Sequence, residues 1–153
     1  MSVQALIEAR VVSPFGPLRL FADDTHLVGL YFEGRPAPAG VRGRSRVLDH
    51  AAAELAAYFA GERCAFGVPI KLGGTAFQRE VWAALGAIPY GETRSYGELA
   101  RPAASRAVGA ANGQNPISIL VPCHRLVGGT GALTGYAGGL AMKRWLLDFE
   151  RAP

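Results

Sequence analysis

The sequence has little of what marks several large classes of protein. Its two cysteines, Cys64 and Cys123, are too few for a disulfide framework and are typical of a protein of the reducing cytoplasm. Only 18% of the 153 residues are charged while 50% are hydrophobic, so the chain can bury a core and is not expected to be disordered. It also lacks an apolar run of about 18 residues and a basic flank followed by an apolar block at its start, so we expect neither a membrane-spanning helix nor a signal peptide.

Positive charge is concentrated in the second half of the chain. Residues 1–70 contain seven Arg and seven acidic residues, whereas residues 71–153 contain seven Arg and two Lys against five acidic residues, which accounts for the net charge of +4. Arginine suits planar, bidentate contact with phosphate, so this half favours an anionic partner such as DNA. Because a charge of +4 is also common in proteins that bind no nucleic acid, charge alone does not show whether the partner is DNA.

One stretch is almost free of charge. Between Ala107 and Met142 the only formally charged residue is Arg125, and Gly, Asn and Pro interrupt the stretch, so it is predicted to be the buried centre of a domain. An unpaired buried charge is costly, so Arg125 is expected to have partners and a structural role.

The first half shows the pattern of a small α/β domain. Short apolar segments separated by Ser, Pro, Gly and Asp predict antiparallel strands. A polar loop is expected at 34–44, a helix at 46–60 and a further short strand at 64–70. This half carries no chemical motif, so residues 1–70 are predicted to be a structural domain. The first three strands are predicted at residues 6–12, 18–22 and 27–33.

The second half, residues 71–153, is predicted to be mostly helical. A capping-box pattern begins a helix at 76–88, and a final helix is expected at 141–150, with a buried, strand-like run at 117–122 between them. Two further helices, 95–100 and 103–113, are separated by Pro102, which makes them a helix-turn-helix candidate.

The second of these two helices has an unusual composition. Nearly all of its side chains are small, and Arg106 is its one long polar projection. Small side chains allow either tight packing in a core, which composition alone favours, or close entry into a narrow groove of DNA. Both interpretations stay open at this point.

Cys123 and His124 are the candidates for chemistry. A thiol with its ordinary pKa of about 8.5 is mostly protonated at neutral pH, and because the thiolate is the nucleophile it needs a base. His124 is placed to supply that base, directly or through a water, and Glu150 in the final helix could orient the imidazole. The pair alone is a weak signal, since a free cysteine is often a small buried hydrophobe and His124 could be a core residue.

The residues around the pair are far more specific. VPCHR follows SRAVGAANGQNPISIL and precedes TGYAGGLAMKRWLLDFE, and together these closely resemble the O6-alkylguanine-DNA alkyltransferases, the methylated-DNA–protein-cysteine methyltransferases, over residues 75–150. SPFGPLRL and AAYFAGE resemble the family's N-terminal domain with less specificity. The resemblance implies an α/β chain with a ribonuclease-H-like first domain and a DNA-binding, alkyl-accepting domain over 71–153. It implies no cofactor.

The resemblance also implies a role for each matching residue. Cys123 takes the alkyl group from O6 of guanine, and also from O4 of thymine, while His124, through a water, and Glu150 draw off its proton. Asn115 braces the active-site segment. Tyr96 helps to rotate the nucleotide and donates a proton to the leaving guanine. Because the thioether product has no easy route back to the thiol, repair is stoichiometric, with one molecule used for each lesion.

Contact with double-stranded DNA, through the minor groove and by a monomer, is implied for the helix 103–113. Arg106 fills the gap that the flipped base leaves in the stack, which offsets part of the cost of flipping. Backbone carbonyls of Cys123 and Leu126 read the exocyclic amine, and Tyr136 with the amide of Ala137 closes the pocket. The other residues implied in DNA contact are Ala107, Ala110, Ala111, Asn112 and Gly113, together with Tyr96.

The sequence departs from the family between Ala100 and Arg106, where it is shorter than the relatives we would align by about one helical turn. This deletion puts the placement of Tyr96 relative to Arg106 in question. The zinc-binding pattern that some relatives carry in their first domain is not reproduced by the available residues, so no metal is expected. Those residues are His26, His50 and Cys64.

Two other functions were weighed against repair by transfer. An alkyltransferase-like protein that flips and binds the lesion without reacting ranks second, because such relatives replace the acceptor and Cys123 is present here. A Cys-His hydrolase ranks third, since the oxyanion-hole donors that acyl chemistry needs are not identifiable.

Overall fold

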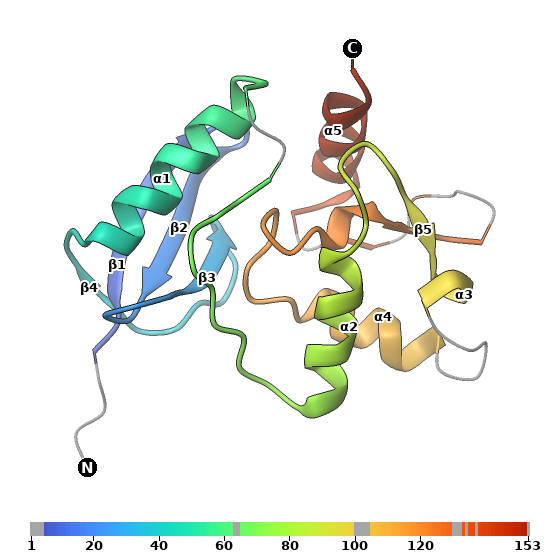
Figure 1. The fold of residues 1–153 in the computed structure, drawn as a ribbon, viewed down its shortest axis with the longest axis horizontal. Coiled ribbons are helices and arrows are strands. Elements are labelled where there is room, and N and C mark those ends of the chain that lie inside the picture. The colour runs from blue at the N-terminus through green and yellow to red at the C-terminus, as the bar shows by residue number, and fades with distance from the viewer. Residues whose placement is uncertain are drawn as a thin grey trace. The chain divides into compact units, whose positions relative to one another are not determined.

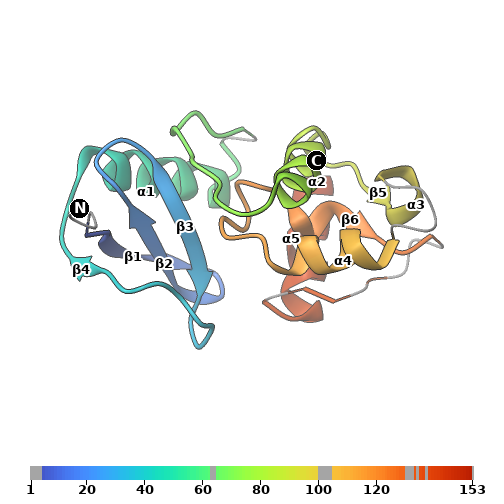
Figure 2. The ribbon, with the colours of Figure 1, turned by 90° about the horizontal axis from the view of Figure 1, so that it is seen from below.

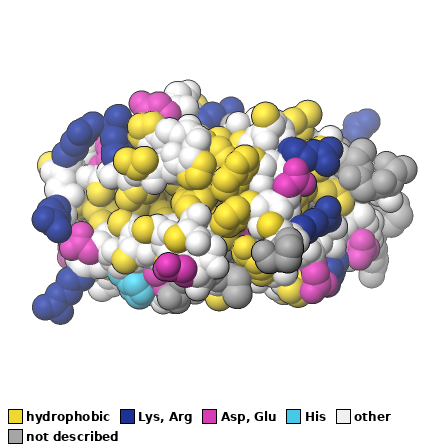
Figure 3. Space-filling view, turned by 90° about the horizontal axis from the view of Figure 1, so that it is seen from above, with side chains coloured by type: hydrophobic (Ala, Val, Ile, Leu, Met, Phe, Trp, Pro, Cys, Tyr) yellow, Lys and Arg dark blue, Asp and Glu magenta, His cyan; other side chains and the backbone are white. Residues whose placement is uncertain are grey.

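The computed structural model describes residues 5–62, 65–99, 105–129, 133, 135–136 and 138–152. The chain forms two compact units, residues 1–72 and 73–153. Within the described part of the chain, no helix is long and apolar enough to cross a membrane. Basic and acidic side chains are interspersed on the face drawn in Figure 3, so charge there favours no single class of partner.

The first unit is a four-stranded sheet with one helix packed on it (Figures 1 and 2). The strand order is β3-β2-β1-β4, with antiparallel β1–β2 and β2–β3 pairs and a parallel β1–β4 pair. Ser45 caps the helix by accepting a hydrogen bond from Leu48 N. The elements are β1 (Ile7–Ser13), β2 (Gly16–Ala22), β3 (Leu27–Phe32), β4 (Val41–Arg42) and α1 (Arg46–Phe59).

Burial explains why the helix packs on the sheet. Residues of α1 at helical spacing are buried, and so are Leu18 and the last three residues of β2 and most residues of β3. Removing these apolar side chains from water provides the main stabilisation of this unit. The largest fully buried side chains here are Leu18, Leu20, Phe21, Leu27, Leu30, Leu48, Leu55 and Tyr58.

The three predicted antiparallel strands and the helix are confirmed, and two expectations for this unit are wrong. The segment 34–44 is not all loop, since it contains β4, whose parallel pairing makes the sheet mixed. The described part of 64–70 is not a strand, apart from a single bridge between Ile70 and Leu27. The reason is that the buried carboxylate of Glu54 accepts hydrogen bonds from the amides of Gly67 and Val68, so these amides need no neighbouring strand.

The second unit is mostly helical, as predicted, and two of its helices, α2 and α5, pack against a short 3₁₀ turn, Cys123–Arg125. A two-residue parallel pair, β5–β6, lies beside this turn and was not predicted from the sequence. Trp82 donates from Nε1 to the carbonyl of Ala111 at 2.8 Å, which ties α2 to α4. The elements are α2 (Ala76–Gly86), β5 (Arg94–Ser95), α3 (Tyr96–Leu99), α4 (Ser105–Gly113), β6 (Leu126–Val127) and α5 (Leu140–Arg151).

The segment 117–122 is buried as expected, but it is not an extended strand. It turns back on itself, with Val121 N donating to Ile117 O at 3.0 Å and a single bridge between Ser118 and Val121. Ile119 has φ 75°, a conformation that is strained for a β-branched residue. This turn brings the chain to Cys123.

Candidate active site

The predicted acceptor lies in the interior of the second unit. Cys123, His124 and Arg125 form the 3₁₀ turn and are all buried, with Cys123 2% exposed and His124 fully enclosed. Arg125 N donates to Pro122 O at 2.9 Å, and Leu126 N donates to Cys123 O, which closes the turn. Consecutive residues on one tight turn therefore hold the thiol and the imidazole in a fixed relation.

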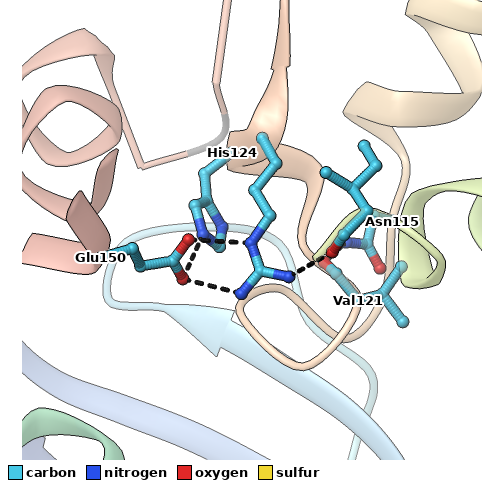
Figure 4. A network of polar contacts seen from close by, with 6 residues as sticks. Asn115, Val121, His124 and Glu150 are labelled. Carbon is cyan, nitrogen blue, oxygen red and sulfur yellow. Dashed lines mark hydrogen bonds and ion pairs between the residues drawn. The ribbon is translucent and has the colours of Figure 1, made fainter. Parts of the chain in front are cut away.

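Glu150 on α5 joins the turn through two side chains (Figure 4). Its Oε2 lies 2.8 Å from His124 Nε2, and the guanidinium of Arg125 donates to both of its oxygens, at 2.8 and 2.9 Å. Arg125 also donates from Nη1 to Ile88 O at 2.7 Å. The structure thus places the predicted His124–Glu150 pair in contact and shows the partners expected for a buried Arg125.

The protonation of His124 follows from these contacts. An ionised carboxylate only accepts hydrogen bonds, so we assign the imidazole proton to Nε2 and a lone pair to Nδ1. Among the described residues, the buried Nδ1 has no hydrogen-bond partner. Burial lowers the pKa of His124, although Glu150 acts in the opposite direction, so the ring stays neutral at physiological pH. A neutral imidazole with a free Nδ1 lone pair is a general base.

Cys123 is a protonated thiol in this environment. Burial raises its pKa, while hydrogen bonds with the side chains of Asn115 and Ser118, and the charge of Lys143, lower it to a smaller extent. The thiol therefore does not rest as an exposed thiolate, and it needs a base to become a nucleophile. His124, the next residue in the chain, is the base that the sequence predicts, and this role stays a prediction.

Asn115 holds the segment that leads to the thiol. Its Nδ2 donates to Val121 O at 2.7 Å, and its Oδ1 accepts from Ile117 N at 3.0 Å, so one side chain spans the strained turn at Ile119 (Figure 4). These bonds give Asn115 the contacts that the predicted bracing role requires. The role itself stays a prediction.

The helix α4 has one buried and one exposed face. Its buried residues include Ala111 and Asn112, whose side chains lie on the packed side of the helix, and their predicted contact with DNA stays a prediction. Their burial follows from the helical period, which turns every third or fourth residue toward the core. The exposed residues of the predicted contact set are Arg106, Ala107, Ala110 and Gly113.

Tyr96 lies against α4 although the segment that joins α3 to α4 is short. Its ring atom Cε1 is 3.5 Å from where a Cβ on Gly109 would be, which is ordinary van der Waals contact. Gly109 stands one helical turn from Arg106, so α3 and α4 bring Tyr96 close to the exposed face of α4. The residues between the two helices, 100–104, lie outside the described residues, and so does the shortened segment.

The predicted pocket residues lie around the same turn. The carbonyls of Cys123 and Leu126 each already accept one hydrogen bond, and a carbonyl oxygen has a second lone pair for a ligand. Tyr136 approaches His124 edge-on, with ring centroids 6.4 Å apart. Ala137 lies outside the described residues, so its predicted role stays a prediction.

Lys143 was not predicted as part of this site. It is fully buried on α5, and its Nζ donates to Leu126 O at 2.6 Å. A sequence signal for it exists, because Lys143 precedes Glu150 by seven residues and therefore shares its helix face. Lysine usually lies on the surface, and this kept it out of the candidate set.

The residues considered for a metal are dispersed. In the ranges that the structure describes, no three His, Cys, Asp or Glu side chains gather as metal ligands would. His26 contacts Thr25, His50 contacts Glu54, and Cys64 lies outside those ranges. The absence of a metal stays a prediction.

Comparison with known proteins decides the family. A sequence profile described as "6-O-methylguanine DNA methyltransferase, DNA binding domain" matches residues 76–152, and one described as "6-O-methylguanine DNA methyltransferase, ribonuclease-like domain" matches residues 6–72. The chain belongs to the 6-O-methylguanine DNA methyltransferase family. The resemblance read from the VPCHR element and its flanks is thereby confirmed.

Members of the 6-O-methylguanine DNA methyltransferase family from distant organisms are similar along nearly the whole chain. The methylated-DNA–protein-cysteine methyltransferase of Mycolicibacterium paratuberculosis is 50% identical, covering 95% of this chain and 93% of its own length. That of Methanosarcina acetivorans is 48% identical, covering 90% and 94%. The crystal structure of the Mycobacterium tuberculosis enzyme in complex with DNA superposes with a TM-score of 0.89 at 47% identity, covering 95% of this chain and 92% of that one. The predicted mixed α/β fold is therefore confirmed.

Proposed function

We propose that this chain repairs DNA directly, by moving the alkyl group of O6-alkylguanine from the base to Sγ of Cys123, once per molecule. The observation that carries the proposal is that Cys123, His124 and Glu150 are buried together in the second unit. Glu150 binds Nε2 of the imidazole, and Nδ1 has no hydrogen-bond partner among the described residues. Relatives at about half identity are methylated-DNA–protein-cysteine methyltransferases, which supports the same reaction here.

The reaction balances with groups of this site. The Sγ proton passes to Nδ1 of His124, directly or through a water, and Glu150 stabilises the imidazolium that forms. The thiolate attacks the alkyl carbon in line with the C–O6 bond, so the S–C bond forms as the C–O bond breaks and its electron pair goes to the guanine. A proton donated by Tyr96 lets the guanine leave neutral, and the imidazolium proton restores the balance through solvent. The products are a thioether at Cys123 and repaired guanine.

The burial of Cys123 supports base flipping. Cys123 is only 2% exposed, so an alkyl group stacked inside a duplex cannot reach its sulfur unless the nucleotide leaves the helix. The exposed face of α4 presents small side chains beside Arg106, which suits close approach to the minor groove with the arginine filling the vacated stack. The proposal includes α3 and α4 as a helix-turn-helix, a monomeric protein in the cytoplasm, and O4-alkylthymine as a second substrate.

An alkyltransferase-like protein that binds the lesion without reacting is not favoured. Its binding function would not require a thiol, yet Cys123 is present with the His124–Glu150 pair beside it. The two functions differ in one measurable product, because only transfer changes the mass of the protein.

Intact-mass spectrometry after incubation with a duplex containing O6-methylguanine tests the proposal. We expect a gain of one methyl group per molecule, absent from Cys123→Ala, with peptide mapping that places the methyl group on Cys123. Tight binding with no change in mass would favour the lesion-binding alternative, and a methyl group on any other residue would overturn the assignment of Cys123.

A further inference from the structure

The proposed chemistry leaves one buried charge unused. Lys143 is one of only two lysines in the chain, and it has no exposed surface. Burying an ammonium group is costly because it loses its hydration, so lysine is almost never fully buried unless it is paired. Its position therefore needs a compensating interaction.

A hydrogen bond connects Lys143 to the acceptor residue through Leu126. Nζ donates to Leu126 O at 2.6 Å, and Leu126 N in turn donates to Cys123 O. Two successive hydrogen bonds thus run from the ammonium to the backbone of the cysteine. Leu126 O is also one of the two carbonyls predicted to read the exocyclic amine of guanine, so Lys143 fixes the direction of that carbonyl.

Helix α5 holds the turn at both ends. Lys143 and Glu150 are separated by two helical turns on one buried face, with Leu146 and Leu147 between them. Glu150 binds side chains of the turn, and Lys143 binds the backbone just after it. The same helix therefore supplies one negative and one positive group to the acceptor site.

The positive group acts on the sulfur. The charge of Lys143 lowers the pKa of the Cys123 thiol against the larger effect of burial, and a Cys123 thiolate raises the pKa of Lys143 in return. Helix α2 also packs against the turn, but its charged residues Arg79 and Glu80 are exposed. Among the described residues, the charged and titratable groups with a contact at the site are Tyr90, His124, Arg125, Tyr136, Lys143 and Glu150.

We propose that Lys143 is a positioning residue of the acceptor site, whose ammonium fixes the Leu126 carbonyl and stabilises the Cys123 thiolate while the alkyl group is transferred. When the Sγ proton moves to His124, a negative charge forms on sulfur where water does not screen it, and a nearby positive charge lowers the energy of that state. No proton leaves Lys143, and the negative charge on sulfur disappears as the S–C bond forms. The inference rests on the proposed function for the transfer step, but its test does not.

Three substitutions separate the charge from the hydrogen bond. Lys143→Arg keeps both, Lys143→Gln keeps a donor without the charge, and Lys143→Met removes both at similar length. The rate of modification of Cys123 by iodoacetamide, followed by peptide mass spectrometry as a function of pH, gives the apparent pKa of the thiol without any DNA. We expect the Gln and Met variants to raise this pKa by about one unit, which is about tenfold less thiolate at neutral pH, and Arg to restore it.

The chain offers a matched control. Lys71, the other lysine, is exposed and pairs with Asp23, so Lys71→Met should leave the apparent pKa of Cys123 unchanged. With O6-methylguanine duplex, Lys143→Gln should react about tenfold more slowly near neutral pH and approach the unsubstituted protein at high pH, where the thiol ionises without help. A purely structural role would lower the rate equally at every pH.

The pKa of Lys143 itself can be measured by NMR, which tests the inference even if the Lys143 variants do not fold. With ¹⁵N-labelled lysine the protein has two side-chain signals, and Lys71 serves as the internal reference. Because coupling between two titrating groups is reciprocal, Cys123→Ser should lower the pKa of Lys143 by as much as Lys143 lowers that of Cys123. An unchanged Lys143 pKa in Cys123→Ser, or an unchanged Cys123 pKa in folded Lys143→Gln, overturns the inference. If the pKa values of Lys143 and Cys123 depend on each other but no methyl group is transferred, the proposed function is contradicted and this inference stands.

Discussion

Each unit of this chain buries a glutamate on a helix, and each glutamate approaches a histidine, yet the two sites differ in their donors. Glu54 in the first unit accepts from the backbone amides of Gly67 and Val68 and lies 3.4 Å from His50, whose side chain is 47% exposed. Glu150 in the second unit binds the side chains of two neighbouring buried residues, His124 and Arg125.

The difference teaches what turns a buried carboxylate into part of an active site. Backbone donors fix the path of a loop, and a carboxylate that they saturate has a structural task. A carboxylate that binds an imidazole orients a group able to accept a proton, and this becomes chemistry when a thiol is the next residue. We therefore expect the same amino-acid pair to have a structural task in the first unit and a chemical task in the second.

The largest expected effect comes from exchanging each glutamate for glutamine. Glu150→Gln leaves Arg125 and the imidazole without their anion, so we expect a loss of about 3–5 kcal/mol in stability and about 10²–10⁴-fold in the rate of methyl transfer. Glu54→Gln should cost about 1–3 kcal/mol and leave the rate per folded molecule unchanged. Chemical denaturation and single-turnover kinetics measure both. Slow methyl transfer by Glu54→Gln, or unchanged methyl transfer by Glu150→Gln, would contradict the difference that we infer between the two units.

Replacing each histidine by glutamine tests the difference between the two units in the rate of methyl transfer alone. His124→Gln removes the only base proposed for the thiol, and we expect transfer to slow by about 10²–10⁴-fold. His50→Gln alters a partly exposed contact in the first unit and should leave the rate as it is. Quenched-flow measurement of methyl transfer distinguishes them, and equal rates would remove His124 from the mechanism.

The pH dependence of stability gives a smaller effect with a defined sign. Burial lowers the pKa of His124 in the folded protein, so below the ordinary value of about 6.5 the unfolded chain binds more protons. Its contribution to stability is therefore complete above about pH 6.5 and is lost as the pH falls through the lowered pKa, at up to about 1.4 kcal/mol per pH unit. Denaturation at pH 7.5 and 5.5 should show this loss in the unsubstituted protein and less of it in His124→Gln.

The smallest effect is expected on the exposed face of α4, which is proposed to contact DNA. Arg106→Ala should slow the repair of duplex DNA by about tenfold more than it slows reaction with a free O6-alkylguanine base, because the free base leaves no gap to fill. Arg44→Ala, at a highly exposed arginine of the first unit, is the matched control and should change neither reaction. If Arg106→Ala slowed both reactions to the same extent, its role in the base stack would be refuted.

Much of the second unit was predictable from neighbours in the chain. Thr75 and Gln78 form both halves of a capping box at the start of α2, as their spacing predicts. The small-residue helix and the final helix were also predictable, since composition and period are local. The segment 117–122 was not, because its apolar composition suits a strand equally well and the side chain of Asn115 bends it instead.

The candidate site was predictable where residues adjoin and incomplete where they do not. Cys123, His124 and Glu150 were named in advance, whereas Lys143 was overlooked because lysine is expected on the surface. The burial of Ala111 and Asn112, which were predicted to contact DNA, follows from the period of α4 and was established only by the structure.

The amino-acid order alone determined that a thiol and an imidazole are neighbours, where most helices begin and end, and which family the chain joins, because these depend on residues close together in the chain. Only the tertiary structure decided that Glu150, 26 residues beyond His124, divides its carboxylate between the imidazole and Arg125, and that Lys143 points at Leu126. The physical reason is that these contacts depend on how α5 packs against the turn, and burial there sets the pKa of each group through desolvation, which no local pattern encodes.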